Sequence, residues 1–155
     1  MTLNVKRTYD PQTVREVMTH PAMWETVAED GQDPGEYTPD TVGDCWLAMR
    51  VEGELIALYA LDAINAVTLE IHAQVVPKHR KQYSGATGKA ALQWILDNTD
   101  AMKVIAWVPE IYPNVRDFTV SQGFQIEGVN RKSYLKHGKL HDLTLLGITR
   151  DEIHG

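Results

Sequence analysis

At 155 residues, the chain is long enough for one domain with a substantial hydrophobic core. Fifteen basic and twenty-one acidic side chains give a formal net charge of −6. This balance disfavours nucleic acid as a partner, because nucleic-acid-binding proteins usually present a net basic face. It is compatible with a cationic substrate and is also ordinary for a soluble protein. A single cysteine, Cys45, excludes an intramolecular disulfide and fits a reducing cytoplasm, and the lack of a long apolar run predicts no membrane partner.

The N-terminal third predicts a strand, two helices and a long loop. Residues 3–9 alternate well enough for a strand, and Asp10-Pro11 then opens a helix, because Asp is a favourable N-cap and Pro is tolerated at the first helical position. Pro21 ends this helix, and a second short helix is expected to follow it. Residues 29–44 are acidic and rich in turn formers, which indicates a surface loop. Its acidic side chains either attract a basic substrate or are simply solvated.

The middle of the chain predicts a hairpin followed by a strand, a basic loop and a helix. A Glu52-Gly53 turn separates two apolar strands, CWLAMRV and ELIALYAL. The next strand begins near Val67, and PKHRKQYSGATG is then interpreted as a loop before a helix that ends near Asn98. Backbone N–H groups lack partners at such a helix start, where the helix dipole is positive. This junction therefore suits a phosphorylated ligand.

The C-terminal third predicts a strand, a short helix and a second hairpin. MKVIAWV is apolar enough for a buried strand, and residues 113–122 form a short helix that Gly123 closes. The final hairpin turns at His137-Gly138. The expected order of the whole chain is β-α-α-β-β-β-α-β-α-β-β.

This order and two blocks of sequence resemble the GCN5-related N-acetyltransferase (GNAT) family. The first block, EIHAQVVPKHRKQYSGATGKAAL, is similar to the family's acyl-CoA motif, in which a strand ending V-x-P-x-x-R precedes a Gly-rich loop and a helix. The second block, PNVRDFTVSQGFQIEGVNRKSYLKHGKLHDLTLLGITRDEI, is similar to the family's C-terminal part. The resemblance covers about residues 67–150. The whole chain also resembles small GNAT-like proteins encoded by tailed bacteriophages.

The resemblance implies an α/β (α+β) fold in a single acyltransferase domain over residues 1–155. Its mixed, mostly antiparallel sheet would have about seven strands, flanked by about four helices. The central strand and the strand that begins near Met102 would splay apart into a V-shaped cleft. The implied co-substrate is acetyl-CoA, and the implied acceptor is an amine on a small molecule or a protein.

The resemblance also implies the residues of the site. Direct transfer needs a group that accepts a proton from the attacking amine. Glu70 falls where histone-type members carry their catalytic glutamate, and His72 shares its strand face and titrates near neutral pH as a residue type. The alternative for each is an ordinary strand residue, ion-paired or packed. Backbone amides at the end of the central strand, at Val75 and Val76, would bind the pantetheine arm.

The phosphate loop departs from the family pattern R/Q-x-x-G-x-G/A. Arg80 is followed by KQYSGATG, so the glycines come late, and the motif can start at Gln82 or at Tyr83. The second register keeps a small residue at each glycine position. In this register the CoA pyrophosphate would bind main-chain amides, with Arg80 or Lys81 near a phosphate. The expected loop residues are Tyr83, Ser84, Gly85, Ala86, Thr87 and Gly88.

The helix before Gly123 lacks the tyrosine that protonates the leaving thiolate in many family members. Thr119 occupies that position, four residues before the glycine, and a threonine hydroxyl is a poor acid. Tyr112 and Tyr134 could substitute, although neither matches the motif. Asn114 lies near the family's CoA-contacting asparagine; the alternative is that it caps the helix.

No metal site is expected, because Gly138 places a turn between His137 and His141. Two functions stay open. One is an acyl-CoA-dependent N-acyltransferase that passes acetyl from acetyl-CoA to an amine by direct attack, which Glu70 and the basic strand end favour. The other is a catalytically silent GNAT-like binding or structural protein of a phage particle or its assembly, which the altered loop and Thr119 favour. A homodimer or a phage structural partner is compatible with either.

Overall fold

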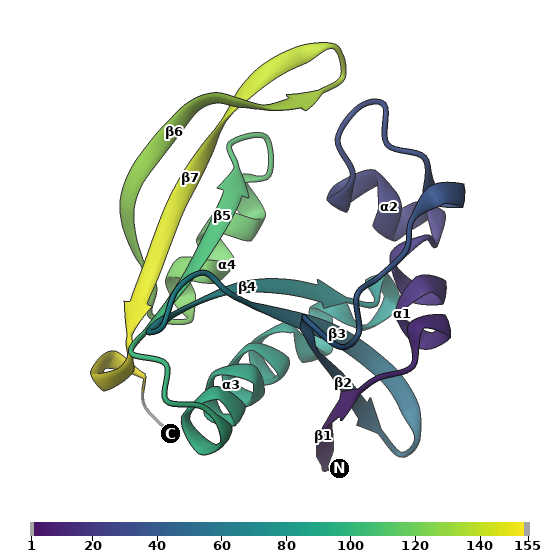
Figure 1. The fold of residues 1–155 in the computed structure, drawn as a ribbon, viewed down its shortest axis with the longest axis vertical. Helices are drawn as coiled ribbons and strands as arrows, with labels where there is room; N and C mark the ends of the chain where they lie inside the picture. Colours follow the sequence, from purple (N-terminus) through teal and green to yellow (C-terminus); the bar gives the residue numbers. More distant parts are fainter. Residues whose placement is uncertain (1, 154–155) are drawn as a thin grey trace.

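The computed structural model describes residues 2–153, and its elements follow the expected order (Figure 1). The strands are β1 (Leu3–Thr8), β2 (Cys45–Val51), β3 (Glu54–Ala63), β4 (Thr68–Val75), β5 (Lys103–Pro109), β6 (Gln125–Lys136) and β7 (Lys139–Thr149). The helices are α1 (Pro11–Met18), α2 (Pro21–Val27), α3 (Arg80–Asn98) and α4 (Pro113–Ser121). Short 3-10 turns are η1 (Pro34–Glu36), η2 (Pro77–His79) and η3 (Arg150–Glu152).

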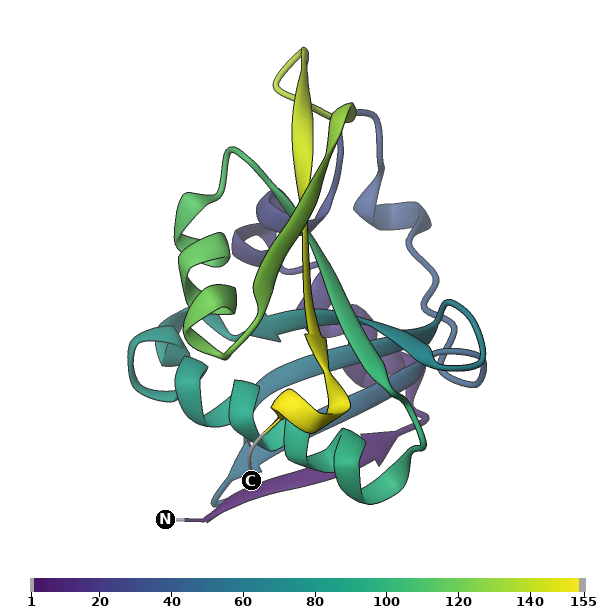
Figure 2. The same cartoon turned by 90° about the vertical axis from the view of Figure 1, so that its left-hand side faces the viewer.

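The seven strands form one sheet in the order β1-β2-β3-β4-β5-β7-β6. Neighbouring strands are antiparallel, except that β4 and β5 run parallel. Helices α3 and α4 cover one face, and α1 and α2 lie on the other (Figures 1 and 2). This mixed, mostly antiparallel sheet with its four helices confirms the expected fold class. Within residues 2–153, no helix combines the length and the hydropathy needed to cross a membrane.

Strands β4 and β5 form a fork. They pair over three positions only, which are Thr68–Lys103, Leu69–Val104 and Glu70–Ile105. Beyond Glu70, β4 stays with β3 as far as Val75, while β5 follows β7 as far as Pro109, so the two strands diverge (Figure 1). A cleft of about 890 Å³ opens in the fork. The expected V-shaped cleft is confirmed.

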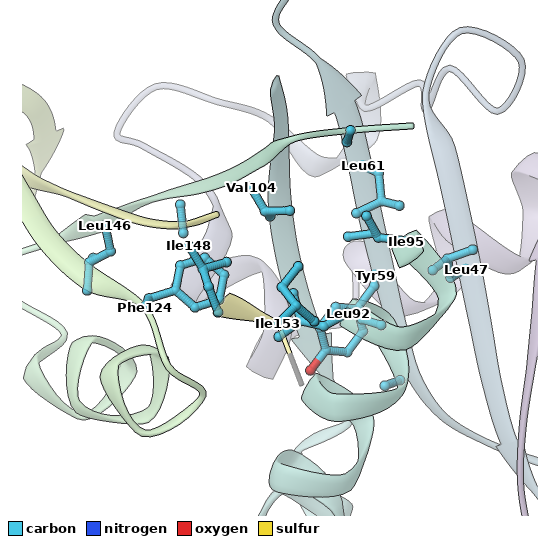
Figure 3. Close-up of a cluster of buried hydrophobic side chains, with 14 of the residues drawn as sticks. Leu47, Tyr59, Leu61, Leu92, Ile95, Val104, Phe124, Leu146, Ile148 and Ile153 are labelled. Atoms are coloured by element: carbon cyan, nitrogen blue, oxygen red, sulfur yellow. The ribbon is translucent and has the colours of Figure 1, made fainter. Parts of the chain in front are cut away.

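The apolar core lies between the sheet and α3. Figure 3 shows its side chains, which come from β2, β3, β5, β7, α3 and the segments next to them. Ile95 of α3 and Leu47 of β2 are fully buried. Tyr59 is also buried there, and its hydroxyl forms a hydrogen bond with Thr87 of α3 at 3.0 Å. Burial raises the pKa of Tyr59 to about 12, so this hydroxyl stays protonated and joins α3 to the sheet.

Helix α3 begins earlier than the sequence predicts. The segment interpreted as a loop is the 3-10 turn η2 followed by the first nine residues of α3, so the expected loop is wrong. Two glycines cost about 1 kcal/mol each in a helix. Buried contacts offset that cost: Thr87 binds Tyr59, and Gly88 lies against α4.

Gly88 permits close packing of two helices. A Cβ atom at this position would lie 2.6 Å from Oε1 of Gln122 and 3.2 Å from the ring of Phe118. Phe118 lies in α4 and Gln122 is its C-cap, so a side chain at residue 88 would displace the Gln122 side chain and press on the ring of Phe118. The absent side chain is therefore explained by helix packing and not by the approach of a phosphate.

The loop after α2 binds the tip of the β6–β7 hairpin. The Asp30 carboxylate accepts hydrogen bonds from the backbone N–H groups of His137 (3.0 Å) and Gly138 (2.7 Å), which lower its pKa. Lys136 is only 5% exposed, and its Nζ donates to the carbonyl of Ala28 at 2.7 Å. We call this contact between residues 28–30 and 135–138 the clasp. It gives the acidic loop a structural role that the sequence did not predict.

Candidate active site

The backbone of β4 is open to the cleft along one edge. The N–H of Val76 donates to the carbonyl of Ile56 next to β3 at 2.8 Å. Backbone N–H and C=O groups alternate in direction along a strand. Residues that lie an odd number of positions before Val76 therefore direct these groups away from β3 and into the fork. Ile71 lies next to the last pair of β4 with β5, so the residues whose groups face the open fork are Ala73 and Val75. With β5 diverging there, an extended ligand can hydrogen-bond to this edge as an added strand would.

This geometry separates the two amides expected to bind pantetheine. The amide of Val75 faces the fork, whereas that of Val76 is already used in the sheet, so the structure contradicts the expectation for Val76. Nε of Arg80 donates to the carbonyl of Val75 at 3.1 Å. Ala73, which is exposed and lines the cleft, was missed, because its role depends on the pairing register of β4.

The polar face of β4 forms a cluster on the opposite side of the sheet from α3. Nε2 of His72 lies 3.1 Å from Oδ2 of Asp62 on β3 and 3.2 Å from Oε2 of Glu70. Glu70 is the last residue of β4 that pairs with β5, so the cluster stands at the base of the fork. The structure thus brings together both candidate bases and adds Asp62. Register explains that addition, because Asp62 pairs directly with Glu70 across β3 and β4.

Asp44, just before β2, completes the cluster. Burial raises its pKa to about 6, and the neighbouring carboxylate of Asp62 acts in the same direction. All four side chains of the cluster line the cleft, and these are Asp44, Asp62, Glu70 and His72. Within residues 2–153, no set of three or more His, Cys, Asp or Glu side chains has a geometry that would hold a metal ion.

The basic residues at the end of β4 do not converge on one point. Lys78 and His79 both pair with Glu54, at 3.4 Å for Lys78. Arg80 turns back toward Val75 and places Nη2 3.9 Å from the sulfur of Met23. No side chain caps the start of α3 by a hydrogen bond. Amides of its first turn and the exposed Lys81 are therefore the groups best placed for an anion.

The other residues expected in the phosphate loop lie within α3. Their backbone amides belong to the helix, so they do not form the expected cradle of free N–H groups. Gly85 and Ala86 face solvent, whereas Thr87 is fully buried. Ser84 and Gly88 line the cleft. Tyr83 packs edge-on against the ring of His79.

Thr119 does not offer a free hydroxyl. It is buried, and its Oγ1 donates to the carbonyl of Val115 within α4 at 2.8 Å. Tyr112 and Tyr134 line the cleft, and the hydroxyl of Tyr112 donates to the carbonyl of Glu25 at 3.4 Å. Burial raises the pKa of both tyrosines, that of Tyr134 to about 12. Asn114 also lines the cleft, but it sits in the first turn of α4 after the N-cap Tyr112, so it is not the cap.

The architecture matches solved N-acetyltransferases. Spermidine N-acetyltransferase from Vibrio cholerae, in complex with CoA and spermine, aligns with a TM-score of 0.75 at 16% identity, covering 97% of each chain. A chimera of SpeG from Vibrio cholerae and hSSAT aligns with a TM-score of 0.81 at 16% identity, covering 99% of this chain and 98% of the chimera. At this identity the likeness establishes the fold, which is that of the GNAT N-acetyltransferases.

Within that fold class, the chain belongs to the family described as "Protein of unknown function (DUF2824)", whose profile matches residues 6–155. No curated protein matches the chain at a significant level.

Proposed function

We propose that this protein is an acetyl-CoA-dependent N-acetyltransferase that acts on an amine. The observation that carries the proposal is the fork of β4 and β5, with an unpaired backbone edge on one side and Glu70 and His72 at its base. Its support from relatives is the shared fold with a spermidine N-acetyltransferase that binds CoA and spermine.

Acetyl-CoA supplies the thioester that is transferred. Its pantetheine arm would bind the free edge of β4, where the backbone groups of Ala73 and the N–H of Val75 face the fork. Its pyrophosphate would bind the uncapped start of α3 with the side chain of Lys81, which shifts the expected site from Tyr83–Gly88 to the first turn of the helix. Asn114 lines the cleft at the start of α4 and is placed to contact the same ligand.

The chain's own residues would supply the proton acceptor. A protonated amine must lose a proton before its nitrogen attacks the thioester carbonyl, and Glu70 or His72 takes that proton. The new C–N bond forms and the C–S bond breaks. The acylated nitrogen gives its second proton to water, and the leaving thiolate of CoA takes a proton from water, giving an N-acetyl amine and CoA. A role for Tyr112 and Tyr134 as the acid is disfavoured, because burial raises the pKa of both hydroxyls.

A cationic amine is the acceptor class that this cleft favours. Three carboxyl groups, those of Asp44, Asp62 and Glu70, line the cleft, and the chain carries a formal net charge of −6. Opposite charge raises the local concentration of a cationic ligand in a concave site.

The test combines binding and turnover. In a calorimetric titration the protein should bind acetyl-CoA, and it should acetylate at least one member of a panel of di- and polyamines. Glu70→Gln and His72→Ala should both keep the affinity for acetyl-CoA. At least one of them should lose about 10²–10⁴-fold in kcat, the usual contribution of a general base. Glu16→Gln, on the exposed face of α1, is the matched control and should lose nothing.

A second candidate function is a binding or structural role without catalysis, including the phage particle or assembly role suggested by the sequence resemblance. The closure of the phosphate loop into α3 and the bonded hydroxyl of Thr119 favour it. The titration with acetyl-CoA distinguishes the two candidate functions. If the parent protein neither binds acetyl-CoA nor acetylates any amine of the panel, the catalytic proposal is wrong and the binding role replaces it.

A further inference from the structure

The contacts of His72 determine which of its nitrogens carries the proton. Both carboxylate contacts use the same atom, Nε2, at 3.1 Å from Asp62 and 3.2 Å from Glu70. An ionised carboxylate only accepts hydrogen bonds, and a neutral imidazole carries one N–H. The hydrogen is therefore on Nε2, and the lone pair that can accept a proton is on Nδ1.

The other oxygen of Asp62 explains what holds this carboxylate in place. Oδ1 of Asp62 is buried and has no hydrogen-bond partner. A buried acceptor without a donor is costly, so a nearby donor is favoured. Asp44 lines the cleft beside Asp62, and its raised pKa, about 6, which burial and then Asp62 cause, makes its protonated form accessible. A protonated Asp44 is the donor that Asp62 lacks.

We propose that Asp62 is a positioning residue that fixes His72 with its proton on Nε2, so that Nδ1 of His72 is the base of the transfer reaction. Asp44, when protonated, is the donor for the free Oδ1 of Asp62, and Glu70 is a second carboxylate against Nε2 instead of the base. The inference rests on the proposed function for its catalytic half, whereas the tautomer of His72 is a property of the protein alone.

The surroundings of His72 support this assignment. The ionisable groups around the ring are Asp62 from β3, Glu70 from β4 itself and Asp44 from the segment before β2. The side chains that α1 and α2 contribute to the cleft are uncharged: Met18, Thr26 and Val27. No cation among these lining groups competes for the carboxylates, so both stay directed at the imidazole.

Nuclear magnetic resonance with ¹⁵N-labelled histidine tests the tautomer without any substrate. At pH 8 the parent should show His72 as the Nε2–H form. In Asp62→Ala the ring loses one of two acceptors, and the Nδ1–H form should become detectable. Asp62→Glu should restore the parent spectrum in part, and Asp97→Ala, which removes an exposed carboxylate at the end of α3, should leave it unchanged.

Kinetics test the catalytic half. Asp62→Ala should lower kcat on the order of 10²-fold, the lower end of what a general base contributes, with KM for acetyl-CoA unchanged. His72→Ala should lose more than Glu70→Gln. A parent spectrum with the proton on Nδ1, or an Asp62→Ala variant with unchanged spectrum and unchanged kcat, would overturn the inference. If the parent acetylates nothing but the spectra behave as expected, the proposed function fails and the positioning of His72 by Asp62 stands.

Discussion

The two faces of β4 differ in what they do. Toward α3 the strand presents Leu69, Ile71 and Val75, which pack into the main apolar core. Toward α1 and α2 it presents Glu70 and His72, which line the cleft. Successive residues of one strand therefore face the apolar core and the cleft in turn, because side chains alternate between the faces of a sheet. The comparison teaches that this site is built on a rigid strand and not on a loop.

Substitutions on the two faces of β4 should have different effects. Substitutions on the α3 side should change the free energy of unfolding and leave the cluster around His72 intact. Substitutions in that cluster should change turnover or pH dependence with little loss of stability. The following predictions test this division, in order of decreasing effect.

The largest effect is expected at the centre of the α3 face. Ile95 is fully buried, and Ile95→Ala removes methyl groups and leaves a cavity. We expect a loss of about 2–5 kcal/mol in the free energy of unfolding. Urea denaturation followed by circular dichroism measures it. Val42→Ala, at a side chain that is 77% exposed, is the control and should stay within about 0.5 kcal/mol of the parent. A loss below that of the control would contradict the assignment of the core.

An intermediate effect is expected where α3 meets α4. Gly88→Leu forces a side chain against Gln122 and Phe118, and overpacking of this kind costs about 1–3 kcal/mol. Gly85→Ala is the matched substitution three residues earlier on the exposed side of α3. With no atom within 4 Å of its new Cβ, it should gain up to about 1 kcal/mol from helix propensity. Thermal melting of both variants measures the two changes in stability. Equal effects at the two glycines would mean that α4 does not pack on Gly88 as described.

The smallest effect is expected at Asp44 and depends on pH. The folded state raises the pKa of Asp44 from 3.8 to about 6, so it binds more protons than the unfolded state between these values. This group's contribution is therefore fully present below pH 4 and is lost as pH rises through 6. Asp44→Asn keeps a donor for Asp62 at every pH, so it should raise the melting temperature at pH 8 more than at pH 5. A variant that is equally destabilised at both values would show that the two carboxyl groups do not share a proton.

The sequence predicted the order of the elements and the turns, because alternation, turn residues and caps are local signals, whereas the fork was predicted from the family resemblance. Asp10 does cap α1, with its carboxylate accepting from the N–H of Gln12. The start of α3 was missed because its cause is not local. The glycines at 85 and 88 favour a loop by propensity, but the contacts of Thr87 and Gly88 with residues distant in sequence favour a helix.

The candidate site was predictable only in part. Glu70 and His72 could be placed on one face from alternation within a single strand. Asp62 and Asp44 could not, because their proximity depends on the register that sets Asp62 opposite Glu70. The finding that the amide of Val76 is used in the sheet, and so is not free to bind pantetheine, depends on the same register. Asn65 was one sequence signal for this register. Its side-chain oxygen accepts hydrogen bonds from the N–H groups of Val67 and Thr68 in the short turn between β3 and β4.

The clasp has a consequence for how the chain folds and how long the fold persists. Its contact between Lys136 and Ala28 joins residues 108 positions apart, so most of the chain must be ordered before the two segments meet. We expect contacts of such large sequence separation to form late in folding, because closing long loops costs chain entropy before the contact is made. Interactions absent from the transition state slow unfolding without speeding folding. We therefore expect the clasp to prolong the lifetime of the folded state more than it hastens folding.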